Sequence, residues 1–403
     1  MGMADIVAAE PSMVATAGAA RIPVVLQLVS RLDAGLAARM AIDSAVAVSR
    51  AGGRALVASG GGPYLHELER AGIRHIALPI ATDGDFGRWS SMRRLRRLVR
   101  EEDVSIVHTF GLMATMAARR AAMGRPTRVV SSYLETVEPL SYLKRRKLRQ
   151  MTRADRVIAP SAISTAYLRT EFRLEPTRIA QVPGGVNIAR FAPAAVRAER
   201  IIRLAQQWRV PDDRRIVLVA SPLEPNRGHT VVIEALSRIE HNDIYCLMVG
   251  AKPETQARRE ELEKLIARKN LGGFVYIVDH CSDMAAAYML ADAVVIADRA
   301  PRAFSRVVIE AQAMGRPVIA CSSGGIAEPL IPNETGWTVP VGDPDALAHA
   351  LRAVLGLDTA QRTQLAEAAI SHARANFALE VVGEQMLAVY DSVLETLWAE
   401  ART

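Results

Sequence analysis

Short apolar runs alternate with longer amphipathic segments along most of the chain. Apolar runs bounded by glycine, proline or polar clusters predict buried strands, and the segments between them have helical spacing. We place these strands at 23–30, 55–59, 75–78, 106–109, 129–133, 157–159, 216–220, 244–249, 275–278, 293–297 and 317–321. Repeated strand–helix–strand units predict mostly parallel sheets that are covered by helices on both faces. The chain is therefore expected to be an α/β protein.

One interruption divides this alternation. Residues 182–193, VPGGVNIARFAP, contain two glycines and two prolines, which is typical of a link between domains. A chain of 403 residues with 50% hydrophobic and 23% charged residues is long enough for two domains with separate cores. We predict one domain at 21–190 and a second at 191–380. Residues 1–20 are small and polar and lack the basic start of a signal peptide, which predicts a disordered tail.

The most informative stretch runs from residue 291 to residue 328. A buried strand leads into a loop at 298–304, and a helix with an apolar stripe begins at Ser305 and stops at Gly315 and Pro317. The next strand ends in Ser-Ser-Gly-Gly. Both loops are expected at the carboxyl ends of adjacent parallel strands, where open α/β sheets bind ligands. The free N–H groups of Ser305 and Arg306 at a helix start suit an anion such as phosphate.

The runs AFSRVVIEAQAMGRPVIA, GGIAE and TGWTVPVGDPDALA resemble the donor-binding region of the family 4 retaining glycosyltransferases. The resemblance implies the GT-B fold of two facing Rossmann-like domains, with a last helix, at 381–403, that packs back toward the first domain. It also implies a cytoplasmic enzyme that moves a sugar from a nucleotide-sugar donor to a lipid-linked or polysaccharide acceptor. A non-catalytic relative that serves as a binding, regulatory or scaffold protein is the alternative, and an epimerase of the same fold is a third.

The resemblance also implies roles for particular residues. Glu310 matches the glutamate that grips the nucleotide ribose, and Arg227 could supply a cation to the donor diphosphate. Backbone N–H groups from Ser305 through Arg306 to Val307 would meet the same diphosphate, with Gly35 and Phe304 beside the donor. His108, at a strand end, could contact the acceptor or act as an acid or base, but a buried structural histidine fits the pattern equally well.

Five positions depart from the family pattern. Leu36, Leu134, Pro222, Arg302 and Ser305 stand where the family has glycine, histidine, arginine, glutamate and glycine. A leucine Cβ at position 36 would crowd the approach of the donor phosphates. Arg302 is compatible with an inert loop residue, with a new contact to an anionic donor or acceptor, or with a lost sugar site.

The net charge of +7 is concentrated in two clusters. Nucleic acid is the weaker interpretation because only 5% of the residues are aromatic and no aromatic platform is interleaved with the cations. Residues 140–151 predict a basic amphipathic helix that could lie on an anionic membrane, or else have a solvated face. Its cations are Lys144, Arg145, Arg146 and Lys147. No run approaches the ~20 apolar residues that would span a bilayer.

Metal-binding chemistry has little support in the sequence. Asp83, Gly84 and Asp85 form an Asp-X-Asp sequence, but it lies in a loop of the first domain and does not follow a central nucleotide-binding strand. The three cysteines, Cys246, Cys281 and Cys321, lack metal-type spacing and are expected to be reduced core residues. We expect neither a cofactor nor an essential metal.

Overall fold

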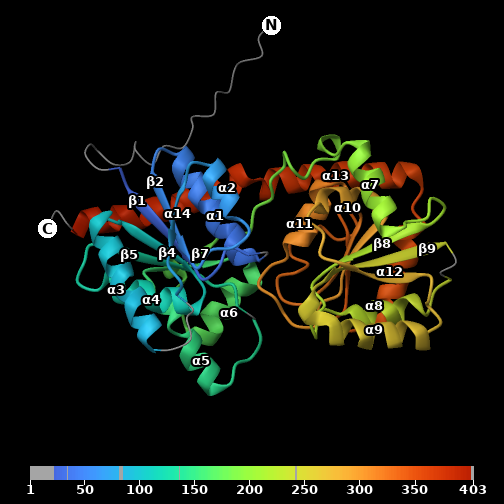
Figure 1. The fold of residues 1–403 in the computed structure, drawn as a ribbon, viewed down its shortest axis with the longest axis horizontal. Coiled ribbons are helices and arrows are strands. Elements are labelled where there is room, and N and C mark those ends of the chain that lie inside the picture. The colour runs from blue at the N-terminus through green and yellow to red at the C-terminus, as the bar shows by residue number, and fades with distance from the viewer. Residues whose placement is uncertain (1–21, 34, 81–84, 136, 241–242, 401–403) are drawn as a thin grey trace, which may run out of the picture.

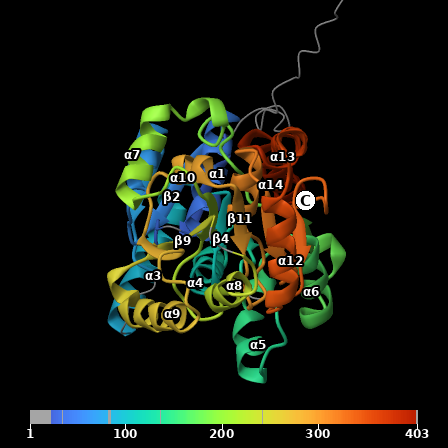
Figure 2. The same ribbon diagram turned by 90° about the vertical axis from the view of Figure 1, so that its right-hand side faces the viewer.

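The computed structural model describes residues 22–33, 35–80, 85–135, 137–240 and 243–400. The tail predicted at 1–20 and the motif residues Asp83 and Gly84 lie outside the described residues. The described chain forms two parallel sheets, and helices cover both faces of each (Figures 1 and 2). The predicted α/β architecture of two Rossmann-like domains is confirmed.

The first sheet has seven strands in the order β3-β2-β1-β4-β5-β6-β7. All six residues of its interior strand β1 are buried, as expected for a parallel strand that is covered on both faces. The strands are β1 (Val24–Val29), β2 (Arg54–Ser59), β3 (Arg74–Ala77), β4 (Ile106–Phe110), β5 (Arg128–Ser132), β6 (Arg156–Ala159) and β7 (Ile179–Gln181). The helices are α1 (Leu36–Arg50), α2 (Leu65–Arg70), α3 (Asp85–Glu101), α4 (Leu112–Ala122), α5 (Tyr142–Leu148) and α6 (Ala162–Phe172).

The second sheet has six strands in the order β10-β9-β8-β11-β12-β13. Its strands are β8 (Arg215–Ala220), β9 (Ile244–Ala251), β10 (Val275–Asp279), β11 (Ala293–Ile296), β12 (Val318–Cys321) and β13 (Trp337–Val339). The helices are α7 (Ala198–Trp208), α8 (His229–Leu236), α9 (Gln256–Arg268), α10 (Met284–Leu290), α11 (Arg306–Ala313), α12 (Pro344–Leu355), α13 (Thr359–Phe377) and α14 (Leu379–Glu400). Strand β8 lies between β9 and β11, so the loops that follow β8 and β11 are neighbours.

The basic helix is shorter than predicted. It was expected over residues 140–151, whereas α5 spans Tyr142–Leu148 and a separate 3-10 turn covers Met151–Arg153. The Ser141 hydroxyl accepts a hydrogen bond from the Lys144 backbone N–H and so defines the helix start. The short strands β7 and β13 and the helix α7 were not predicted.

The last helix returns to the first domain, where it completes a core. Val382, Met386 and Leu394 of α14 are buried in the same hydrophobic cluster as Ile42 and Val48 of α1. Helix α14 lies along the first domain, far from the second sheet (Figure 1). The phenol of its Tyr390 is fully buried and accepts a hydrogen bond from the Gln27 side chain of β1 at 3.3 Å.

The chain crosses between the domains twice, and the two crossings are hydrogen-bonded to each other. The Val186 N–H donates to the Phe377 carbonyl at 2.7 Å, and the Leu379 N–H donates to the Val186 carbonyl at 3.2 Å. A Cβ added at Gly185 would lie 2.7 Å from Cδ2 of Leu379, so a larger residue there would displace that side chain. The crossings therefore form one compact connection.

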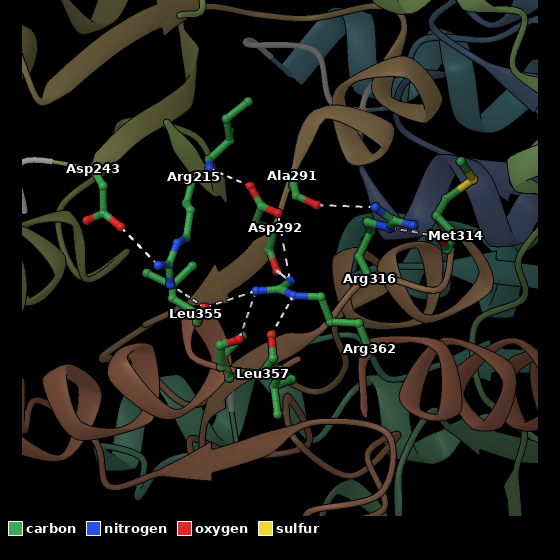
Figure 3. Close-up of polar contacts among 11 residues, drawn as sticks. Arg215, Asp243, Ala291, Asp292, Met314, Arg316, Leu355, Leu357 and Arg362 are labelled. Carbon is green, nitrogen blue, oxygen red and sulfur yellow. Dashed lines mark hydrogen bonds and ion pairs between the residues drawn. The ribbon is translucent and has the colours of Figure 1, made fainter. Parts of the chain in front are cut away.

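At the amino-terminal edge of the second sheet, arginine side chains donate hydrogen bonds to backbone carbonyls of the neighbouring helix ends (Figure 3). Arg362 of α13 donates to the carbonyls of Leu357 at 3.2 Å and Leu355 at 3.2 Å, at the end of α12. Arg316 donates to the Met314 carbonyl at the end of α11, at 3.1 Å. Such contacts satisfy carbonyls that a helix end leaves without partners. This network lies at the starts of the strands, away from their carboxyl ends, and it has a structural role.

Candidate functional site

Loops from both domains meet at the carboxyl ends of β11 and β12. The Gly325 N–H donates to the Arg302 carbonyl at 2.8 Å. A Cβ at Gly324, where φ is +60°, would lie 2.4 Å from the Arg302 carbonyl oxygen, and a Cβ at Gly325 would lie 2.3 Å from the Ala303 carbonyl oxygen. Both glycines therefore serve backbone geometry, because no side chain fits between the two loops. The Gly324 position also faces the Val137 side chain of the first domain.

Two arginines flank one buried carboxylate at this edge. Asp298 is 5% exposed, and its Oδ2 lies 3.5 Å from Nη1 of Arg227 and 3.9 Å from Nε of Arg302. Arg227 also donates through Nε to Glu224 at 2.9 Å. Burial raises the pKa of Asp298, while the charges of Arg227 and Arg302 oppose that rise. The sequence analysis named the two arginines but missed Asp298, which follows the apolar run of β11 and was predictable as a strand-end carboxylate.

Glu310 lies on α11, but its carboxylate already has two partners. It is 7% exposed, and it accepts hydrogen bonds from the Tyr288 hydroxyl at 3.0 Å and from Arg306 at 2.7 Å. Burial and the neighbouring Glu310 raise the pKa of Tyr288 well above its ordinary value, so the phenol stays a donor. A carboxylate has about four lone-pair sites, which leaves room for ribose hydroxyls. The i, i+4 spacing of Arg306 and Glu310 was readable from the sequence.

Arg306 connects this network to a cavity of about 1010 Å³ between the domains. The cavity is lined by α1, by α2, by the crossing segment and by the first residues of α14. On its first-domain side, Arg39 forms ion pairs with Asp43 at 3.0 Å and with Glu67 at 2.6 Å. The Glu310 network therefore reaches the interface between the two domains.

The starts of α11 and α1 lie close together. Ser305 is the N-cap residue of α11, and its side chain makes no capping hydrogen bond. Among the described residues no acceptor outside α11 takes a hydrogen bond from the first N–H groups of that helix, those of Arg306 and Val307, which can therefore serve a ligand. Gly35 is the N-cap residue of α1. A Cβ at Gly184 would lie 3.0 Å from the Phe304 ring and 3.1 Å from the Leu36 side chain. The Leu36 and Phe304 side chains thus both lie against Gly184 at the crossing.

His108 lies away from this edge. It is fully buried, with Nδ1 2.6 Å from the Tyr390 hydroxyl and Nε2 2.8 Å from the Ser132 hydroxyl. Burial lowers the pKa of His108 to about 3. Both ring nitrogens are engaged and the side chain is fully buried, which favours the structural alternative over the acid/base role. Of the other departures, Leu134 packs against the α1 and α14 core, and Pro222 is exposed.

The second domain also caps a helix of the first. Both carboxylate oxygens of Glu328 accept hydrogen bonds at 2.7 Å, from the N–H groups of Ala162 and Ile163 at the start of α6. A carboxylate at a helix start is favoured by the helix dipole as well as by these bonds. The sequence analysis missed this contact, because its partners are 166 and 165 residues apart.

No cluster of three or more His, Cys, Asp or Glu side chains that could hold a metal occurs among the described residues. Cys246, Cys281 and Cys321 are free and buried, as expected for core residues. None of the helices in the described ranges has the length and apolar character needed to cross a bilayer.

Two family models match the chain, one in each domain. The model described as Glycosyltransferase Family 4 matches residues 37–190, and the model described as Glycosyl transferases group 1 matches residues 201–372. The second match includes Arg227, Arg302 and Glu310. Together the two matches cover most of both domains.

Individual relatives and solved structures agree with these models. A D-inositol 3-phosphate glycosyltransferase of Catenulispora acidiphila is 30% identical over 251 residues, which span 60% of this chain and 58% of that protein. A glycosyltransferase structure from Rickettsia africae is 25% identical with a TM-score of 0.83, covering 92% of this chain and 99% of the other. HepE of Anabaena, solved with UDP and glucose, is 22% identical with a TM-score of 0.81 over 92% and 100% of the two chains, and this likeness shows the fold. The chain belongs to the family 4, group 1 glycosyltransferases and has their GT-B fold.

Proposed function

We propose that the protein transfers a sugar from a nucleoside diphosphate donor to a lipid-linked or polysaccharide acceptor. The observation that carries this proposal is the convergence of Arg227 with the free N–H groups of α11, on loops that follow adjacent parallel strands. Negative charge develops on the leaving diphosphate as the glycosidic bond breaks, and fixed N–H dipoles and a cation stabilise it. Glu310 would orient the nucleoside through its ribose. The HepE structure, which contains UDP, favours uridine as the nucleoside.

A scaffold or regulatory function is the second candidate. It is favoured by one observation, namely that Arg306 and Tyr288 already occupy both oxygens of Glu310. Glu310 is also only 7% exposed, and a ribose that cannot reach its remaining lone pairs would leave the donor site closed. Nucleotide binding therefore separates the two functions.

We expect UDP, tested beside GDP and ADP, to raise the melting temperature of the protein. A ligand that binds only the folded state stabilises it by about 2.7 kcal/mol at ~100 times its Kd. Glu310→Gln should reduce the shift, since an amide keeps the side-chain shape but weakens hydrogen bonds from ribose hydroxyls. The exposed Glu263→Gln on α9 is the matched control and should respond as the wild type does. No shift with any of the three nucleotides would reject the enzyme and support the scaffold.

We further propose that α5 docks on an anionic membrane at its cytoplasmic face. Tyr142 and Leu143 at its start are 75% and 67% exposed, which is unusual for large apolar side chains. Lys144 and Arg145 are paired with Glu138 and Glu171, whereas Arg146 and Lys147 are exposed and form no ion pair among the described residues. Apolar side chains beside free cations are typical of interfacial helices.

Cosedimentation with vesicles that contain anionic lipid tests this docking. Binding should weaken as salt rises, because screening shortens the reach of the charges. Changing Arg146 and Lys147 together to glutamate should remove about 2 kcal/mol or more of binding free energy. The same charge change at Arg97 and Arg100 on α3 is the control and should bind nearly as the wild type. Equal recovery on neutral vesicles would rule the docking out.

A further inference from the structure

The Arg302 guanidinium has hydrogen-bond donors without acceptors. Its side chain is 42% exposed, and the nearest carboxylate oxygen, on Asp298, lies 3.9 Å from Nε, which is beyond hydrogen-bonding distance. In the described part of the chain no acceptor receives a hydrogen bond from this side chain, although a guanidinium offers five donors in a fixed plane. The group is thus charged, and its donors remain available to a ligand.

The surrounding charges do not satisfy Arg302. The two carboxylates, of Asp298 and Glu224, balance the charges of Arg227 and Arg302, so the cluster would attract an anion through the unused Arg302 donors and not through net charge. Asp298 has a side chain only 6% exposed and cannot reach out to a ligand, and Glu224 bonds to Arg227. Burial and the neighbouring charge of Arg227 lower the pKa of Arg302, as expected for a cation beside another cation.

The loop that carries Arg302 fixes its position next to the donor groups. Its carbonyl accepts the Gly325 N–H at 2.8 Å, and the Gly324 backbone lies too close for any side chain between them. Three residues further on, the same loop presents the start of α11 at Ser305. The next strand in the sheet leads to Arg227. A group attached to a diphosphate at Arg227 and α11 would lie within the reach of Arg302.

We propose, resting on the function proposed above, that Arg302 binds a carboxylate on the donor sugar, so that the protein uses a nucleotide-linked uronic acid. A planar guanidinium and a carboxylate form two parallel charge-assisted hydrogen bonds, which a neutral hydroxymethyl group cannot match. Arg302 selects the sugar and is not assigned a catalytic step. An anionic acceptor at the same guanidinium is the competing outcome.

Titration calorimetry with UDP, UDP-glucose and UDP-glucuronic acid, without any acceptor, tests this assignment. The wild type should bind UDP-glucuronic acid about 10- to 100-fold more tightly than UDP-glucose. Arg302→Gln should abolish the difference, and Arg302→Glu should invert it. Arg299→Gln removes an exposed cation from the same loop and should keep the wild-type preference. Retained UDP binding in each variant shows that the variant is folded.

Each outcome bears on the assignment. If the wild type binds UDP but does not distinguish the two sugars, the carboxylate site is wrong while the proposed function stands, and an anionic acceptor at Arg302 gains support. If Arg302→Gln keeps a preference for UDP-glucuronic acid, another residue binds the carboxylate and the assignment of Arg302 is wrong. If the wild type binds none of the three ligands, the proposed function and the sugar site are rejected together.

Discussion

Acidification from about pH 7 to about pH 4.5 is expected to lower the free energy of unfolding by about 5 kcal/mol through two buried histidines. Burial lowers the pKa of His108 to about 3 and, with the nearby charges of Arg258 and Arg227, that of His229 to about 4, from an ordinary 6.5. A folded-state pKa below the unfolded-state value means that the unfolded chain binds the proton more tightly. Above pH 6.5 both histidines are neutral in the folded and the unfolded chain, and the free energy of unfolding has its full value. It decreases as the pH falls from 6.5 toward the lowered folded-state pKa values.

Denaturant unfolding at both pH values measures this loss. His108→Gln and His229→Gln should each reduce the difference between the two pH values by about 2.5 kcal/mol, whatever they do to stability at neutral pH. The exposed His349→Gln on α12 is the control. If either buried variant retained the full wild-type loss, protonation of that histidine would not be the cause.

Gly228→Ala is expected to destabilise the second domain by about 3–5 kcal/mol. Gly228 precedes α8 with φ at +73°, and an added Cβ would lie 1.8 Å from the Ala297 carbonyl oxygen and 2.4 Å from its carbon. Both contacts are with backbone at the end of β11, so neither can rotate away. The adjacent Arg227 would move with the loop, and UDP binding should weaken as well.

Gly342→Ala is the control that distinguishes the steric clash of an added Cβ at position 228 from the cost of the left-handed backbone conformation. Gly342 has the same φ of +73°, but the nearest atom to its added Cβ is the Arg299 Nε at 3.9 Å. The free energy of unfolding of this variant should fall only by the ~1–2 kcal/mol that a left-handed backbone conformation costs a residue with a Cβ. Equal destabilisation of the two variants in urea unfolding would show that crowding at Ala297 is not important.

The buried strands were predictable because their signal is local. Parallel strands covered on both faces must be apolar throughout, so the run at β11 and the run at β12 stand out without tertiary information. Strand β13 has only three residues, one of them exposed, and carries no such signal. Helix α5 was predicted too long because its charge pattern continues past Leu148, where the backbone changes to a 3-10 turn.

The site was predictable only where its residues are close in sequence. Glu310 and Arg302 lie in one motif, whereas Tyr288 comes from another helix and was not identified as a partner of Glu310. His108 was placed at a strand end facing a cleft. Its side chain instead points to the face that α14 covers, beside Gln27, its register partner in β1. Its partner Tyr390 is 282 residues away along the chain, so no local pattern reveals what lies above His108.

The two hydrogen-bonded crossings form a single hinge between the domains. The two segments are hydrogen-bonded to each other where Val186 meets Phe377 and Leu379. We expect such a pair to bend together about one line more readily than it allows the domains to twist or slide. On the other side of the interface, the Glu328 carboxylate joins the second domain to the start of α6 through two hydrogen bonds. Helix α6 and the crossings lie toward opposite sides of the interface (Figure 1). A separation of the two domains about this line would therefore have to break the Glu328 hydrogen bonds to α6, whereas the hydrogen bonds between the two crossings could stay intact.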